Sequence, residues 1–153
     1  AQSIGGLVGC AQSSSVISEC LTEGNINANE LGSYVGGLIG LMDAGISGET
    51  KPTVNMNKCC FGGTITVSGT GDTAGGIIGR VTNGNITVNL TECISTGSIT
   101  RETTSSGGAG DIIGYANKGA ITLTDCTGTG ADNKGLVGGK NSANITYNNT
   151  TTE

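Results

Sequence analysis

A five-residue pattern, Gly-Gly-Leu-Ile-Gly at residues 36–40, recurs along this chain. Related stretches stand at 5–9, 75–79 and 110–114, and a shortened copy stands at 135–138. The last glycines of the copies are 24 to 39 residues apart: Gly9, Gly40, Gly79, Gly114 and Gly138. Periods in this range are typical of solenoids, in which each unit buries its apolar side against its neighbours. The pattern therefore predicts a stack of similar units, and any function must be sought on a repeated surface.

Two further markers lie inside each unit. A cysteine is followed four residues later by a glycine, as at Cys20 and Gly24, and an Ile-Thr segment such as 85–88 precedes the cysteine. All these segments are short, rich in β-branched residues, bounded by Gly, Asn or Ser, and without a helical period. We predict an all-β, parallel, right-handed β-helix of about five coils. Residues 1–147 would form one solenoid domain, and 148–153 an Asn- and Thr-rich tail or linker.

The amino-acid composition narrows the classes of function that this chain can have. With no Trp and a single Phe, the core must be aliphatic, and the net charge of −5 without a basic cluster argues against nucleic acid or anionic lipid as a partner. No window approaches 18 apolar residues, so we expect no membrane insertion. The chain has no His, the commonest general base and metal ligand. We accordingly expect no enzyme activity, no metal and no cofactor.

The combination of Gly-Gly-Leu-Val-Gly with a later Glu-Cys and Gly-Asn-Ile resembles the GLUG repeat of bacterial and protist surface proteins. Gly5 to Gly9, Glu19, Cys20, Gly24 and Ile26 carry the likeness in the first unit, and the matching sets at 36–65, 75–99 and 110–130 extend it over most of the chain. The resemblance implies an extracellular, adhesin-like β-solenoid module of a longer protein. It does not extend to the zinc peptidase domains that accompany some such repeats, because a chain without His has no His-Glu-x-x-His site.

The second apolar residue of each glycine-flanked pair forms a row of five. These residues are Val8, Ile39, Ile78, Ile113 and Val137. By the period of two along a strand they share a face with Asp111 and Arg80, which predicts that they point outward. An exposed apolar stripe would be an interaction surface. Alternatively, an insertion at a corner or a bulge that changes the alternation covers the row.

Six cysteines invite two interpretations. Four occupy one repeat position and should stack as an interior ladder: Cys20, Cys59, Cys93 and Cys126. They are either a column of buried thiols or partners in disulfides between adjacent coils. Cys10 and Cys60 lie off this ladder and are the better candidates for a specific disulfide, either with each other or with ladder members.

The charged residues provide one weak candidate for catalysis. Glu19, Lys58, Glu92 and Asp125 share the position before the ladder cysteine, so they should form a surface column with Lys58 between two acids. Asp111 with Arg80 is a second candidate pair. Two carboxylates in one cleft would indicate a carbohydrate-active enzyme, whereas a solvated charge column contributes little to stability.

Outward Thr and Asn residues offer two more hypotheses. A flat Thr array is typical of ice-binding solenoids, but here Thr64, Thr66, Thr87, Thr100, Thr122, Thr124 and Thr146 are interleaved with Asn, Ser and Ala. Asn-x-Ser/Thr sequons predict glycosylation in a secreted eukaryotic protein, at Asn85, Asn89, Asn144, Asn148 and Asn149.

From these features we predict a non-catalytic structural or adhesive module of an extracellular surface protein or fibre. Its partners would be other subunits, other domains of a longer surface protein, or carbohydrate. Three alternatives stay open: a filament subunit that polymerises through its ends and the Val/Ile stripe, a carbohydrate-active enzyme, and an ice-binding protein.

Overall fold

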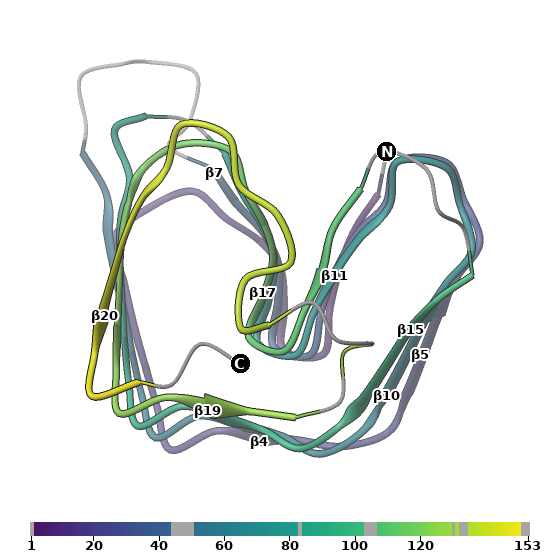
Figure 1. Ribbon diagram of the computed structural model, residues 1–153, viewed down its shortest axis with the longest axis horizontal. Helices are drawn as coiled ribbons and strands as arrows, with labels where there is room; N and C mark the ends of the chain where they lie inside the picture. The colour runs from purple at the N-terminus through teal and green to yellow at the C-terminus, as the bar shows by residue number, and fades with distance from the viewer. Residues whose placement is uncertain are drawn as a thin grey trace.

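A computed structural model describes residues 2–43, 51–82, 84–102, 107–129, 131 and 135–150. These residues contain short β-strands and no helix, and the strands form five sheets in which every pairing is parallel. The predicted parallel β-helix is therefore confirmed. The chain moves counterclockwise in Figure 1 as it advances toward the viewer, so the coil is right-handed, as predicted.

Each coil visits the five sheets in the same order, which we name A to E. Sheet A contains β1 (Ser3–Gly5), β6 (Tyr34–Gly36), β11 (Thr73–Gly75) and β16 (Ala109–Gly110). Sheet B contains β2 (Val8–Ala11), β7 (Ile39–Asp43), β12 (Ile78–Thr82) and β17 (Ile113–Ala116). Sheet C contains β3 (Ser15–Ser18), β8 (Thr53–Asn57), β13 (Thr87–Thr91), β18 (Ala120–Thr124) and β20 (Asn144–Asn148). Sheet D contains β4 (Leu21–Thr22), β9 (Cys60–Phe61), β14 (Ile94–Ser95) and β19 (Thr127–Gly128), and sheet E contains β5 (Asn25–Ala28), β10 (Thr64–Val67) and β15 (Ser98–Arg101).

The coil is folded inward between sheets A and B, so its cross-section has two lobes (Figure 1). Sheets B and C face each other across one lobe, sheets A and E across the other, and sheet D runs along the base of both. The inward fold is the Gly-Gly-Leu-Ile-Gly stretch itself. Gly36 ends β6, Gly37 and Leu38 make a bend, and Ile39 begins β7.

Backbone hydrogen bonds repeat at this bend in each coil. The Ile77 carbonyl accepts the N–H groups of both Leu38 and Ile39, at 3.1 and 2.9 Å, and the corresponding carbonyls of neighbouring coils also accept two. Glycine is needed because sheets A and B almost touch here. A Cβ atom on Gly36 would lie 1.8 Å from the Ile39 carbonyl oxygen. The glycines thus let the chain reverse direction with backbone packed on backbone.

The bend corrects the prediction of an outward apolar stripe. Ile39, Ile78 and Ile113 are fully buried in the core, and Val8 and Val137 are partly buried against it. Leu38 is also fully buried, as predicted. Both members of the pair face inward because the chain turns between them. The alternation breaks a second time at the third glycine of the pattern, because Gly40, Gly79 and Gly114 are left out of the ladder pairings of sheet B. Arg80 therefore points outward, although it has the same parity as the buried Ile78. This result agrees with the alternative prediction for the row, in which a bulge changes the inward and outward alternation of the side chains.

We call the space between the bend and sheet D the waist, and side chains of complementary size fill it. Phe61 lies against Gly37, where a Cβ atom would be 2.4 Å from its ring, and Ser95 lies against Gly76 in the next coil. In the following coil the order is reversed, because Asp111 replaces the glycine and Gly128 stands opposite it. The waist therefore holds one larger side chain per coil.

The corner between sheets C and D has a left-handed backbone in every coil. Glu19, Lys58, Glu92 and Asp125 have φ values of 52 to 53°, and Asn149 has 46°. Asn149 shows that the solenoid continues past the predicted boundary at residue 147. Asn148 pairs with Thr124 in sheet C, and the Thr150 hydroxyl accepts the Cys126 N–H at 3.0 Å. At least as far as residue 150, the segment expected to be a tail belongs to the coil.

Candidate functional site

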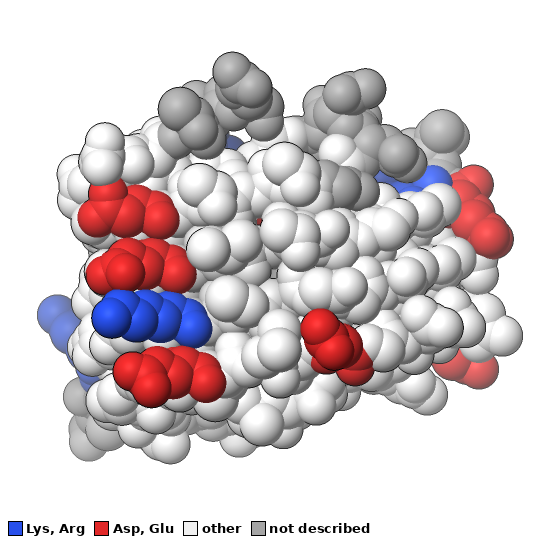
Figure 2. Space-filling model, turned by 90° about the horizontal axis from the view of Figure 1, so that it is seen from below, with Lys and Arg blue, Asp and Glu red and all other residues white. Residues whose placement is uncertain are grey.

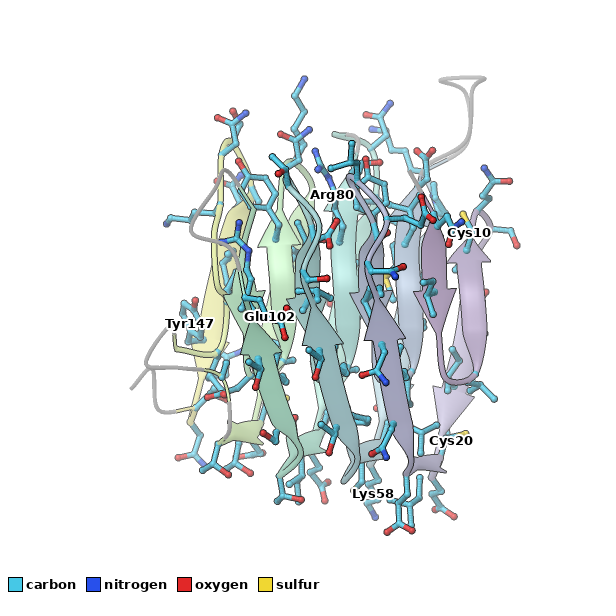
Figure 3. The ribbon with its side chains drawn as sticks, turned by 90° about the vertical axis from the view of Figure 1, so that its right-hand side faces the viewer. Cys10, Cys20, Lys58, Arg80, Glu102 and Tyr147 are labelled. Atoms are coloured by element: carbon cyan, nitrogen blue, oxygen red, sulfur yellow. The ribbon has the colours of Figure 1, made fainter. Side chains whose placement is uncertain are left out.

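The outer faces of sheets A and B line a groove above the bend. Tyr34 and Thr73 come from sheet A, Arg80 and Tyr115 from sheet B, and Gly107 precedes β16. A cavity of about 270 Å³ is lined by Thr73, Arg80, Gly107 and Tyr115. Figure 3 places Arg80 near the upper edge of the solenoid in that view, away from the Lys58 corner.

Arg80 lies between two aromatic rings. Its guanidinium carbon is 4.9 Å from the centroid of the Tyr34 ring and 5.2 Å from that of Tyr115, within the range of cation–π contacts. Tyr115 comes from the next coil of sheet B, where it pairs with Arg80, whereas Tyr34 comes from the facing sheet A. The rings hold the guanidinium in the groove, and no carboxylate of the described residues pairs with it.

Two polar atoms of this groove have no hydrogen-bond partner among the residues that the structure describes. They are Arg80 Nε and Thr73 Oγ1, and both atoms are buried. Thr73 as a whole is 1% exposed. Buried donors and hydroxyls in folded proteins are nearly always paired, so each unpaired one is a candidate contact for a ligand. Ser95 Oγ, Arg101 Nε and Arg101 Nη2 share this property.

Sequence reasoning did not find this groove. The sequence pattern predicts an outward Arg80 and a pairing with Asp111, and it gives no role to Tyr34 or Tyr115. Repeat alignment identifies residues that stack within one sheet, but it does not show which sheets face each other. The available signal was the presence of Tyr34, Arg80 and Tyr115 near the glycine pattern in three successive units.

The cysteine ladder forms as expected. Cys59, Cys93 and Cys126 are fully buried, and Cys20 is partly buried on the first coil. Each buried thiol donates to the carbonyl oxygen of the residue three before the ladder cysteine of the preceding coil, as Cys93 Sγ does to Met56 at 3.5 Å. All six cysteines are free, so the coils are not joined by disulfides in this structure. Burial raises the pKa of the Cys59 thiol, which makes it a poor nucleophile.

Cys10 and Cys60, the candidates for a disulfide, are both free and lie on different sheets. Cys10 is on sheet B and pairs with Leu41, whereas Cys60 is on sheet D and pairs with Leu21 and Ile94. The bend and the waist separate these sheets. Burial, and to a smaller extent the charge of Asp43, raise the pKa of the Cys10 thiol.

The charge column forms, and it lies on an exposed corner. The four residues lie one above another, with Lys58 between Glu19 and Glu92. The ladder pairings of sheet C and the backbone hydrogen bonds at the corner place them there. All four side chains are exposed. Figure 2 shows one basic side chain among acidic ones near one edge of a face with few other charges.

Asp111 and Arg80 are not the pair that the sequence predicted. Asp111 points into the waist, is 5% exposed, and accepts the Ala131 N–H at 2.7 Å, whereas Arg80 faces the groove. Burial raises the pKa of the Asp111 carboxyl, partly offset by that hydrogen bond. The structure thus separates Asp111 from the exposed acids of the corner.

The outward Thr and Asn residues are divided between sheets C and E. One row of sheet C reads Thr53, Thr87, Ala120 and Asn144, and one row of sheet E reads Asn27, Thr66 and Thr100. Neither row is Thr throughout. Among the sequon residues, Asn85, Asn144, Asn148 and Asn149 are exposed, whereas Asn89 is half-buried and donates to Asn55 Oδ1 at 3.0 Å.

Comparisons with other proteins leave the family open. No protein-family model, curated protein or solved structure matches the chain. The resemblance to GLUG repeats therefore stays a prediction from the sequence. In the part of the chain that the structure describes, no helix is long and apolar enough to cross a membrane, and no three His, Cys, Asp or Glu residues are grouped as a metal would need.

Proposed function

We propose that this chain is a structural and adhesive β-solenoid module of an extracellular surface protein or fibre, and that it acts by contact without catalysis. The observation that carries the proposal is the open face of the first coil. All five strands of that coil, β1 to β5, lie at sheet edges. Unpaired strand edges are templates for further strands. An edge of this kind can pair with a strand of another protein, as a contact module requires.

The core at this face supports the same interpretation. Ile4, Val8, Ile17 and Ile26 are only partly buried, although their partners in the second coil, Val35, Ile39, Met56 and Ile65, are fully buried. A further coil would bury these side chains completely, and burial stabilises by about 25 cal/mol per Å² of apolar area removed from water. The surface location rests on the repeat resemblance, and the mixed Thr and Asn rows supply polar groups for contact with a carbohydrate or protein surface.

The same open face favours one second candidate, a filament subunit in which the added coil belongs to another copy. The buried isoleucines remove the apolar stripe from that hypothesis, so the contact would be made by the coil faces alone. The carbohydrate-active alternative is less well supported, because Glu19, Glu92 and Asp125 lie on a convex corner and Asp111 lies in the interior.

Adhesion under flow tests the proposal. Beads that carry the chain through a terminal tag are passed over epithelial cells and over immobilised polysaccharides, with beads carrying heat-unfolded chain as the control. We expect retention that soluble folded chain competes away, and no new reducing ends in the polysaccharide. Release of reducing ends would contradict the absence of catalysis, and equal retention of both bead types would contradict the adhesive role.

A further inference from the structure

The groove between sheets A and B contains donors that the fold leaves unused. We propose that this groove binds a small organic carboxylate, with Arg80 as the residue that receives it and Thr73 as a second donor. This site goes beyond the proposed role as a module and does not depend on it.

The position of Arg80 leaves its donors available. Tyr34 and Tyr115 lie within 4.9 and 5.2 Å of the guanidinium carbon, and they restrict the side chain to the groove. A guanidinium carries five N–H donors in one plane, a fork that matches the two oxygens of a carboxylate. Because the tyrosines already restrict the arginine, a ligand would find the fork preorganised, which lowers the entropic cost of binding.

The two unpartnered atoms show where the ligand would bind. Arg80 and Thr73 both line the cavity, and one atom of each, Arg80 Nε and Thr73 Oγ1, is buried without a hydrogen-bond partner among the described residues. A buried donor without a partner costs free energy that a ligand oxygen would recover. A carboxylate can accept from Arg80 with one or both oxygens, while the Thr73 hydroxyl donates to the same group or to a neighbouring ligand oxygen.

Size and charge define the ligand class. The cavity of about 270 Å³ is smaller than the pockets of about 300 to 1,000 Å³ that hold drug-sized molecules, so the ligand or its bound part is small. The chain has a net charge of −5, which opposes a dianion more strongly than a monoanion. A singly charged carboxylate therefore fits better than sulfate or phosphate. Thr73 and Tyr115, which both carry a hydroxyl, line the cavity, and this favours a carboxylate that carries its own hydroxyl groups, as sugar acids do.

Nuclear magnetic resonance titration of the whole ¹⁵N-labelled chain tests the site. Galacturonate is the probe, galactose is the neutral match of the same shape, and acetate and sulfate are the further arms. We expect saturable shifts of the amides around Thr73, Arg80 and Tyr115 with galacturonate, weaker ones with acetate, and none with galactose. Failure of every carboxylate to saturate by about 10 mM would overturn the proposal. So would equal binding of galactose, or stronger binding of sulfate.

Variants separate binding from a purely structural role of Arg80. Arg80→Gln should weaken galacturonate binding at least about tenfold, since charge-assisted hydrogen bonds are lost. Lys58→Gln removes the same charge at the distant corner and should leave the affinity unchanged. Thr73→Val has a similar shape, keeps Arg80, and should weaken binding several-fold, which keeps the test decisive if Arg80→Gln does not fold. Unchanged affinity in the Arg80 and Thr73 variants would overturn the assignment.

Discussion

At the scale of single residues, glycine controls how closely the parts of this coil approach. Gly37 faces the large Phe61 side chain in the waist. In a later coil the large residue is on the other side, where Asp111 faces Gly128, so the same space is filled in another way. Glycine here is required by packing, because the space of a side chain is already occupied. The free energy of unfolding should therefore depend strongly on this position.

Gly37→Ala should destabilise the protein by about 2 kcal/mol or more, because overpacking a filled interior forces the backbone or ring to move. Its Cβ atom would lie 2.1 Å from the Gly76 carbonyl oxygen and 2.4 Å from the Phe61 ring. Urea unfolding followed by circular dichroism measures the change.

Gly62→Ala is the matched control for that measurement. Its Cβ atom would meet the Glu23 side chain at 3.7 Å and Thr96 Oγ1 at 3.9 Å, which are ordinary contacts, so we expect a change within about 0.5 kcal/mol. Similar unfolding midpoints for the two variants would show that the waist is not as tightly filled as the structure indicates.

At the scale of elements, two local departures from a regular strand shape each coil. The bend at the glycine pattern turns sheet A into sheet B, and the left-handed corner turns sheet C into sheet D. Residues other than Gly adopt the left-handed region at a cost of about 1 kcal/mol, and Asn adopts it more readily. The last coil uses Asn149 at this corner, whereas the earlier coils use charged residues.

Glu92→Asn should accordingly stabilise the protein by about 0.5 kcal/mol, because Asn relieves the left-handed backbone at φ 52°. The substitution loses attraction to Lys58 and repulsion from Asp125, and these exposed effects are small and opposite. Thermal unfolding at constant pH and salt measures it. Glu23→Asn, which removes the same charge from an exposed residue outside the left-handed set, should give no gain. An equal gain in both variants would assign the effect to charge.

At the scale of the whole molecule, the stack continues the same hydrogen-bonding pattern from coil to coil and leaves one complete coil face open. At the open face, the unpaired backbone edges form a rim around partly buried apolar side chains of the core. A surface of this kind is complementary to another coil of the same type. In the isolated chain this face can stack on the last coil of another copy, where β19 and β20 also lie at sheet edges, so copies should associate end to end.

Negative-stain electron microscopy and light scattering should show end-to-end rods that lengthen as the concentration rises. Ile26→Lys places a charge at the open face and should yield monomers, whereas Thr66→Lys, on the outer face of sheet E within the stack, should still form rods. Circular dichroism checks that both variants keep their β-structure. Wild-type particles that stay monomeric at high concentration would exclude the filament hypothesis.

Much of the fold could be predicted from the repeats. The stacking of Cys59, Cys93 and Cys126, the shared column of Glu19, Lys58, Glu92 and Asp125, and the inward Leu38 all follow from aligning units, since equivalent residues of a solenoid stack in register. The direction of Ile39 and Asp111 could not be predicted, because counting parity assumes a continuous strand. The bend and the break at the third glycine invalidate that assumption.

The sequence by itself determined that the chain is an all-β parallel solenoid with an aliphatic core, because periodic apolar, cysteine and glycine positions can be satisfied together only by stacking. Only the tertiary structure decided that the coil folds inward at Gly36 to Gly40 and brings Tyr34 and Thr73 of one sheet beside Arg80 and Tyr115 of another. The physical reason is that repetition specifies contacts along the stack, whereas the shape of each coil depends on how closely backbones pack across it. The candidate site arises from that cross-coil packing.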